Sequence, residues 1–240
     1  MSGAVLFDIG DTLVRRPEVG PGRRIADALG LGRDEARVIG GWLFREAFAS
    51  PRALAERLRD AFGLPEHIDE PIAAIWEAQE TEPIEVDGAT ACVAAVRERG
   101  ARVGVVSNIW APYETGFRRA CPGIVPLVET WQLSYRAGVA KPDPALFRAA
   151  LDALGVAPAN ATMIGDSLEK DVRPALALGM RAIWVAPHTT AAPLPPAAGD
   201  VTAAARDAFR DEDAARVLRV DDLHAARTAL ARFLAGGRLV

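Results

Sequence analysis

The stretch VLFDIGDTLV, residues 5–14, decides the fold class of this chain. Three apolar residues run directly into Asp8, and Asp11 follows three positions later. A short apolar run of this kind is typical of a strand that is buried on both faces of a parallel sheet. In such sheets ligands bind just outside the carboxyl ends of the strands. Asp8 is therefore predicted to end a buried strand and to point into a site.

Three later segments repeat the pattern of a short apolar run followed by polar or glycine-containing sequence, at 101–106, 161–165 and 181–185. Helical patterns that end at glycines, as helix C-termini often do, lie at 90–100, 145–155 and 171–179. A last strand and a last helix are expected after a Pro/Ala-rich loop, at 215–220 and 222–234, with the loop at 187–199. This alternation predicts an α/β fold with a Rossmann-like core, in which helices cover both faces of a parallel sheet.

Residues 15–83 contain no convincing strand and have the spacing of several amphipathic helices. The segment is far too long for a connecting loop, so we expect an inserted helical cap over the site. The core then comprises residues 1–14 and 84–240. The helices are expected at 22–31, 33–48, 51–63 and 70–80. Several cap side chains could reach a polar or anionic substrate, but such residues are usually solvated or packed, and none is assigned to specificity: Arg15, Arg16, Arg23, Arg24, Trp42 and Arg45.

Composition excludes several classes of function. The 240 residues are 50% hydrophobic and 25% charged, with a formal net charge of −4, which is typical of a globular protein. No basic patch indicates nucleic acid. No apolar run is long enough to span a membrane or, at the N-terminus, to form a signal peptide, so we expect a cytoplasmic protein. Cys92 and Cys121 are expected to be buried free thiols.

Four motifs follow the predicted strands or precede a predicted helix: FDIGDTL (7–13), VVSN (105–108), KPDP (141–144) and GDSLEKD (165–171). Together and in this order they resemble the haloacid dehalogenase superfamily of hydrolases, in the subgroup with a helical cap after the first motif. The resemblance covers essentially the whole core. It implies a phosphatase that binds Mg²⁺ and acts on a small phosphorylated metabolite through an aspartyl-phosphate intermediate.

The acidic residues suit this chemistry. Asp8 can act as a covalent nucleophile, since a carboxylate is already ionised at neutral pH. Asp166 and Asp171 would repel Asp8 unless a hard cation such as Mg²⁺ neutralised the group. The resemblance assigns Asp8, Asp166 and the backbone carbonyl of Gly10 to Mg²⁺ and makes Asp171 a ligand or a neighbour of the ligands. Asp171 also stands where the N-cap of the following helix belongs, so both interpretations stay open.

Ser107, Asn108 and Lys141 are the candidate phosphate-binding residues. A hydroxyl, an amide and backbone N–H groups at the end of a strand can hold a phosphate, and the resemblance implies this use of Ser107 and Asn108. Lysine is rare in this chain: of 28 basic residues only Lys141 and Lys170 are lysine. A compact ammonium at Lys141 can sit between carboxylates and phosphate as a catalytic and binding group, with Asp143 as the N-cap of the next helix.

Gly10 departs from the resemblance. Most phosphatases of the superfamily carry an acid/base aspartate two positions after the nucleophile, and here that position is glycine. Asp11 stands one place later, either as a catalytic group or as a turn aspartate. General acid–base catalysis contributes on the order of 10² to 10⁴ in rate, and its loss matters least for a weakly basic leaving group. We therefore predict either a bias toward good leaving groups, such as anomeric sugar phosphates, acyl phosphates or aryl phosphates, or an enzyme whose cap or substrate supplies the proton.

Two alternatives remain. A metal-independent 2-haloacid dehalogenase also uses an aspartate nucleophile and lacks the second aspartate, but GDSLEKD (165–171) supplies acidic groups that a metal enzyme needs. A catalytically weak binding or regulatory protein would explain Gly10, yet it gives no reason to keep a group of mutually repelling charges.

Overall fold

The computed structural model describes residues 3–186, 213 and 215–234 of the chain. The Pro/Ala-rich loop expected at 187–199 lies outside these described residues.

A six-stranded sheet in the order β5-β4-β1-β6-β7-β8 forms the core, and each neighbouring pair is parallel. Its strands are β1 (Ala4–Phe7), β4 (Arg102–Ser107), β5 (Thr130–Leu133), β6 (Ala161–Gly165), β7 (Arg181–Val185) and β8 (Val217–Val220). Phe7 at the end of β1 lies opposite Val105 of β4 and Ile164 of β6. The residues that follow β1, β4 and β6 therefore meet at one edge of the sheet, as the sequence predicted.

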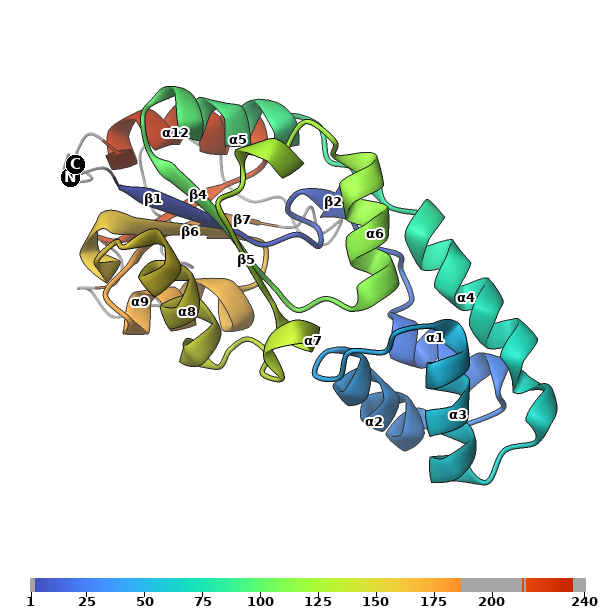
Figure 1. Ribbon diagram of the computed structural model, residues 1–240. Helices are drawn as coiled ribbons and strands as arrows, with labels where there is room; N and C mark the ends of the chain where they lie inside the picture. Colours follow the sequence, from blue (N-terminus) through green and yellow to red (C-terminus); the bar gives the residue numbers. More distant parts are fainter. Residues whose placement is uncertain (1–2, 187–212, 214, 235–240) are drawn as a thin grey trace, which may run out of the picture.

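Both faces of the sheet are covered by helices, which confirms the predicted α/β architecture (Figure 1). One face carries α5 (Ala89–Glu98) and α12 (Leu223–Leu234), and the other carries α8 (Pro144–Leu154) and α9 (Arg173–Ala177). Side chains of β1 alternate between these faces, because successive residues of a strand point to opposite sides. Val5 and Phe7 join the cluster under α5 and α12, whereas Leu6 joins the cluster under α8.

Four helices lie beyond the carboxyl ends of the central strands (Figure 1). Along the chain they come between two short strands. They are α1 (Pro21–Ala28), α2 (Arg33–Leu43), α3 (Pro51–Phe62) and α4 (Asp69–Thr81). We call them the cap helices. The strands β2 (Val14–Arg15) and β3 (Ile84–Glu85) pair antiparallel where the chain leaves and re-enters the core. The helix expected at 33–48 ends earlier, at Leu43.

The cap helices contact the core through α4 and α6 (Ala111–Ala120). Trp110 precedes α6, and its Nε1 donates a hydrogen bond to Gln79 Oε1 of α4 at 3.0 Å. Its ring also meets Trp76 edge to face, with centroids 5.4 Å apart. A Cβ at Gly116 would lie 2.5 Å from the Gln79 carbonyl oxygen, so glycine is needed for this close helix contact.

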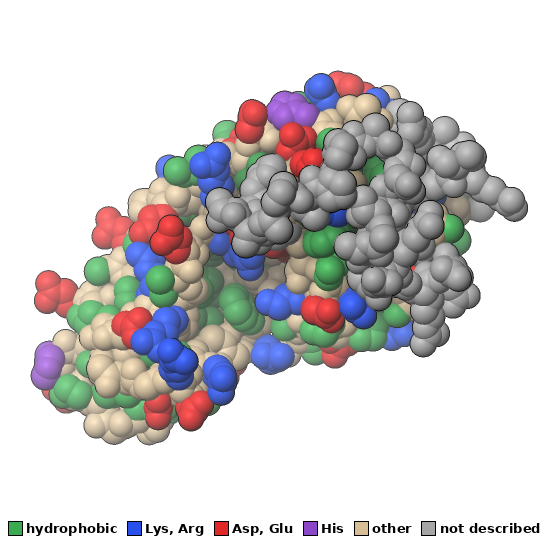
Figure 2. All heavy atoms as spheres, turned by 180° about the vertical axis from the view of Figure 1, so that it is seen from behind, with side chains coloured by type: hydrophobic (Ala, Val, Ile, Leu, Met, Phe, Trp, Pro, Cys, Tyr) green, Lys and Arg blue, Asp and Glu red, His purple; other side chains and the backbone are tan. Residues whose placement is uncertain are grey.

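Short elements complete the fold: η1 (Glu66–Ile68), η2 (Val125–Leu127), α7 (Ser134–Ala137), η3 (Pro158–Asn160) and η4 (Leu168–Val172). Cys92 and Cys121 are buried free thiols, as predicted. Among the described residues no helix is long and apolar enough to cross a membrane. On the face in Figure 2, acidic and basic side chains are interspersed over the cap helices.

Candidate active site

A buried lysine lies between two carboxylates at the carboxyl edge of the sheet. Lys141 Nζ is 2.7 Å from Asp8 Oδ1 and 2.5 Å from Asp171 Oδ1. The side chains of Lys141 and Asp171 are 1% and 0% exposed. Burial alone would lower the pKa of Lys141, but the charges of Asp171 and Asp8 outweigh it and raise that pKa. Lys141 is therefore held as a cation in contact with Asp8.

Strand ends and short loops fix these side chains. The Asp8 N–H donates to the Ile164 carbonyl at 3.0 Å, so the β1–β6 ladder continues through the candidate nucleophile. The Asn108 side chain clamps the main chain of Lys141: Oδ1 accepts from the Lys141 N–H at 2.7 Å, and Nδ2 donates to the Lys141 carbonyl at 2.9 Å. Asp143 caps α8, as predicted. Asp8 and Asn108 thus follow the neighbouring strands β1 and β4, and Asn108 fixes the loop that carries Lys141.

Asp171 is held inside the turn η4, Leu168–Val172, which has π-helical hydrogen bonding. Its Oδ2 accepts a hydrogen bond from the Ser167 N–H at 3.0 Å. Ser167, rather than Asp171, caps this turn by accepting from the Lys170 N–H. The interpretation of Asp171 as a helix N-cap is therefore wrong. A Cβ at Gly165 would lie 2.5 Å from Asp171 Cγ, so glycine there admits the carboxylate.

Asp8, Asp166 and Asp171 each offer a carboxylate oxygen, and these oxygens lie within 4.8 Å of one another. Burial, followed by the charge of Asp8, raises the pKa of Asp166 to about 7, although Arg16 opposes the shift. Burial also raises the pKa of Asp171 to about 6 against the effect of Lys141. The positive charges of Lys141 and Arg16 do not fully neutralise these carboxylates. Such a set of hard oxygen donors fits Mg²⁺.

Arg16 is a second cation of the site. The sequence named it only as one of several cap side chains that could reach a substrate and gave it no role. Its Nη2 lies 3.1 Å from Asp166 Oδ2, and its Nε donates to Asp11 Oδ2 at 2.7 Å. The Arg16 N–H also donates to Asp11 Oδ1 at 2.8 Å. Both Asp11 oxygens are therefore bound by Arg16. The structure thus places Asp11 as a partner of Arg16, with its side chain 39% exposed. Its catalytic role stays a prediction.

Gly10 explains why Arg16 can reach the site. A Cβ at Gly10 would lie 2.8 Å from Arg16 Cδ and 2.9 Å from Arg16 Cγ. A side chain at this position would thus compete with Arg16 for the same space. No local pattern in the sequence relates residues 10 and 16, and only the return of the chain through β2 brings them together.

Of the other two candidate phosphate-binding residues, Asn108 contacts Lys141, and Ser107 directly precedes Asn108. Ser107 is the last residue of β4, and its side chain is buried. Both polar atoms of the Asn108 amide contact the main chain of Lys141. The Ile109 N–H donates to Ser134 Oγ at 3.1 Å, so this backbone group is already bound. Asn108 therefore has a structural function in the site, besides the phosphate contact that the resemblance implies.

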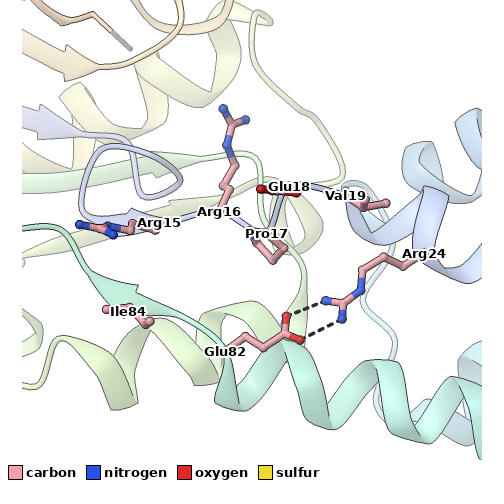
Figure 3. Close-up of a pocket in the computed structure, with 8 residues that line it drawn as sticks. All are labelled: Arg15, Arg16, Pro17, Glu18, Val19, Arg24, Glu82 and Ile84. Atoms are coloured by element: carbon pink, nitrogen blue, oxygen red, sulfur yellow. Dashed lines mark hydrogen bonds and ion pairs between the residues drawn. The ribbon is translucent and has the colours of Figure 1, made fainter. Parts of the chain in front are cut away.

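Arg15 and Arg16 extend in different directions from the linker into the cap helices (Figure 3). A pocket of about 450 Å³ lies at this junction. Across it Arg24 binds Glu82 through two contacts, of 2.6 Å and 2.9 Å. The pocket is lined by Arg15, Arg16, Pro17, Glu18, Val19, Arg24, Glu82 and Ile84.

The remaining candidates of the cap helices have local partners. Arg23 pairs with Asp27, Arg45 binds the Gly41 carbonyl, and Trp42 packs against Phe62. In the described part of the chain, Arg16 is thus the only one of the six cap candidates that contacts the group of Asp8, Asp166 and Asp171.

The family model for hydrolases of the haloacid dehalogenase-like type matches residues 3–179. The chain belongs to this family. A phosphoserine phosphatase of Thermus thermophilus is 37% identical over 142 residues, which cover 58% of this chain and 56% of that protein. A glyceraldehyde 3-phosphate phosphatase of Pyrococcus abyssi is 33% identical over 100 residues, 42% of each chain. The chain thus matches about half the length of these haloacid dehalogenase-like relatives or less.

Solved structures of the family share the fold. A phosphatase from Thermococcus onnurineus superposes with a TM-score of 0.58 at 23% identity, over 100% of both chains. A 2-haloacid dehalogenase from Pseudomonas syringae gives a TM-score of 0.64 at 22% identity, over 97% of this chain and 100% of the other. Because both enzymes have this fold, the likeness does not separate the two activities.

Proposed function

We propose that this haloacid dehalogenase-like hydrolase is a Mg²⁺-dependent phosphatase that cleaves a small phosphomonoester through an aspartyl-phosphate on Asp8. The observation that carries the proposal is the position of Asp8, beside the Lys141 ammonium and within one cluster of carboxylate oxygens with Asp166 and Asp171. The related phosphatases support phosphate ester hydrolysis as the reaction class.

Asp8 attacks phosphorus in this mechanism, and the bond from phosphorus to the leaving oxygen breaks. Water then attacks the same phosphorus and displaces Asp8, which releases inorganic phosphate. Lys141 holds Asp8 Oδ1 at 2.7 Å and leaves the second oxygen as the nucleophile. Lys141, with Ser107, also attracts the phosphoryl oxygens as the substrate enters.

Asp8, Asp166 and the Gly10 carbonyl would hold Mg²⁺, which neutralises negative charge and polarises a phosphoryl oxygen. Asp171 lies behind them in this proposal, because its oxygens already bind Lys141 Nζ and the Ser167 N–H. Its part is to keep Lys141 in place.

The leaving group sets the expected substrate preference. Gly10 offers no acid, and both oxygens of Asp11 are bound by Arg16. Without a proton donor the chain loses a contribution on the order of 10² to 10⁴ in rate, least for a weakly basic leaving group. We therefore infer a preference for acyl, aryl or anomeric sugar phosphates among small cytoplasmic metabolites.

Hydrolysis of p-nitrophenyl phosphate by the purified protein tests this function. We expect turnover with Mg²⁺, none with a chelator, and a loss of at least about 10³-fold in Asp8→Asn. Asp152→Asn is the matched control, because Asp152 is an exposed residue of α8 and its loss should leave activity intact. Turnover that survives both the chelator and Asp8→Asn would contradict the proposal. Metal-independent release of halide from a 2-haloacid that requires Asp8 would establish the dehalogenase alternative instead.

A further inference from the structure

We propose that Arg16 is a substrate-contacting residue that donates hydrogen bonds to the leaving oxygen of the phosphomonoester, in the space that Gly10 leaves open. The inference rests on the proposed phosphatase function and adds a residue to it. Asp11 is the residue that positions Arg16.

Arg16 lies on the solvent side of the acidic cluster. Its side chain is 50% exposed, whereas those of Lys141 and Asp8 are 1% and 12% exposed. A substrate that arrives from solvent therefore meets the Arg16 guanidinium before it reaches Lys141.

In-line displacement places the leaving oxygen on the side of phosphorus opposite the attacking oxygen. The buried side of Asp8 is occupied by Lys141 and Asp171, so the leaving group must point toward the exposed side. Among the described residues, Lys141 and Arg16 are the cations in contact with these carboxylates, and Arg16 is the one on the exposed side. The leaving oxygen and the guanidinium thus share the same side of the site.

Arg16 has donors to offer. A guanidinium carries five N–H groups, and the contacts with Asp11 and Asp166 involve Nε and Nη2. Nη1 can donate to a ligand while these contacts persist. Asp166 uses Oδ2 for Arg16, and its second oxygen can serve Mg²⁺ at the same time.

Asp11 and Arg16 form a closed unit that orients the guanidinium. Asp11 has a left-handed backbone, with φ of 52°, which aspartate tolerates better than most residues. This conformation accompanies its contacts with both the main-chain N–H and the Nε of Arg16. Arg15, the preceding residue, extends elsewhere (Figure 3), and so provides a natural control.

The proposed contact stabilises charge and transfers no proton, because a guanidinium stays protonated in proteins. As the phosphorus–oxygen bond breaks, the leaving oxygen takes the electron pair and hydrogen-bonds to Arg16. It then acquires its proton from water. The benefit grows with the basicity of the leaving oxygen, because a more basic oxygen carries more developing charge.

The test is kcat/KM for a series of aryl phosphates of increasing leaving-group pKa, from p-nitrophenyl phosphate to phenyl phosphate. Arg16→Ala should lose about 10²-fold with phenyl phosphate and much less with p-nitrophenyl phosphate. The dependence of rate on leaving-group pKa therefore becomes steeper, whereas Arg15→Ala should keep the wild-type slope. Asp11→Asn should steepen the slope in the same way. The double variant that combines Asp11→Asn and Arg16→Ala should have the same slope as Arg16→Ala alone.

Calorimetric titration of Mg²⁺ into the wild type and Arg16→Ala gives a readout besides activity. We expect both proteins to bind one ion, so the change in slope is not loss of metal. Equal losses for all aryl phosphates would overturn the leaving-oxygen contact, as would an Arg16→Ala variant that binds Mg²⁺ more tightly and turns over faster. A wild-type protein without Asp8-dependent turnover would instead overturn the proposed function, and this inference with it.

Discussion

Two cations contact the same group of carboxylates, Lys141 at Asp8 and Asp171 and Arg16 at Asp166, and they are held in different ways. Lys141 is fully buried, and side chains from several elements of the core enclose it. Arg16 is half exposed and is held by Asp11, five residues before it. Lys141 therefore balances charge within the core, whereas Arg16 can form contacts at the mouth of the site without being part of the core.

Loss of Lys141 should have the largest effect on folding. In Lys141→Met, Asp8 and Asp171 lose their shared counter-ion while they remain buried, and breaking a buried ion pair costs about 3–5 kcal/mol. The free energy of unfolding, measured with urea, should fall by this amount, and phosphatase activity should be lost. Lys170→Met is the matched control, because Lys170 is the other lysine of the chain and is exposed.

That control should change the free energy of unfolding by less than about 0.5 kcal/mol. If Lys141→Met were as stable as Lys170→Met, the buried cation would not be needed for charge balance, and the distinction between the two cations would fail.

Removing the Asp166 carboxylate should change the free energy of unfolding less than removing Lys141 does, and in the opposite direction. The pKa of Asp166 is raised by folding to about 7, so the folded protein keeps a proton that the unfolded chain loses. The free energy of unfolding of the metal-free protein should therefore fall as pH rises from about 4 to about 7. Asp166→Asn removes this penalty and should stabilise the metal-free protein by about 1–3 kcal/mol near pH 7.5.

Thermal unfolding with and without Mg²⁺ checks both parts of this prediction. Mg²⁺ should stabilise the wild type and have little effect on Asp166→Asn, and the gain from the substitution should shrink near pH 4. A variant that is less stable than the wild type near pH 7.5 would show that the contact with Arg16 outweighs the cost of burying the carboxylate.

Much of the core was predictable from the sequence, because short apolar runs give buried strands with little ambiguity. Asp8 and Asp166 follow such runs directly, and their meeting at one sheet edge follows from parallel topology. The strand β5, Thr130–Leu133, was missed because its residues do not form a continuous apolar run. Asp171 was partly misinterpreted, since the helix expected from 171 is preceded by a π-helical turn that Ser167 caps.

The Arg16 side of the site could not be predicted in the same way. Its contact with Asp166 joins residues 150 positions apart, and it depends on the missing side chain of Gly10. The sequence shows that an acid is absent at position 10. Only the structure shows that an arginine occupies the space.

Detection of a phosphoryl group on Asp8 during turnover would show the proposed covalent intermediate itself. Protein in the course of turning over p-nitrophenyl phosphate with Mg²⁺ is quenched in acid at successive times, and the peptide that contains Asp8 is examined by mass spectrometry. We expect a phosphoryl group on Asp8 that appears and decays with turnover and is absent in Asp8→Asn. Phosphate release with Asp8 unmodified at every time point, together with an active Asp8→Asn protein, would contradict it.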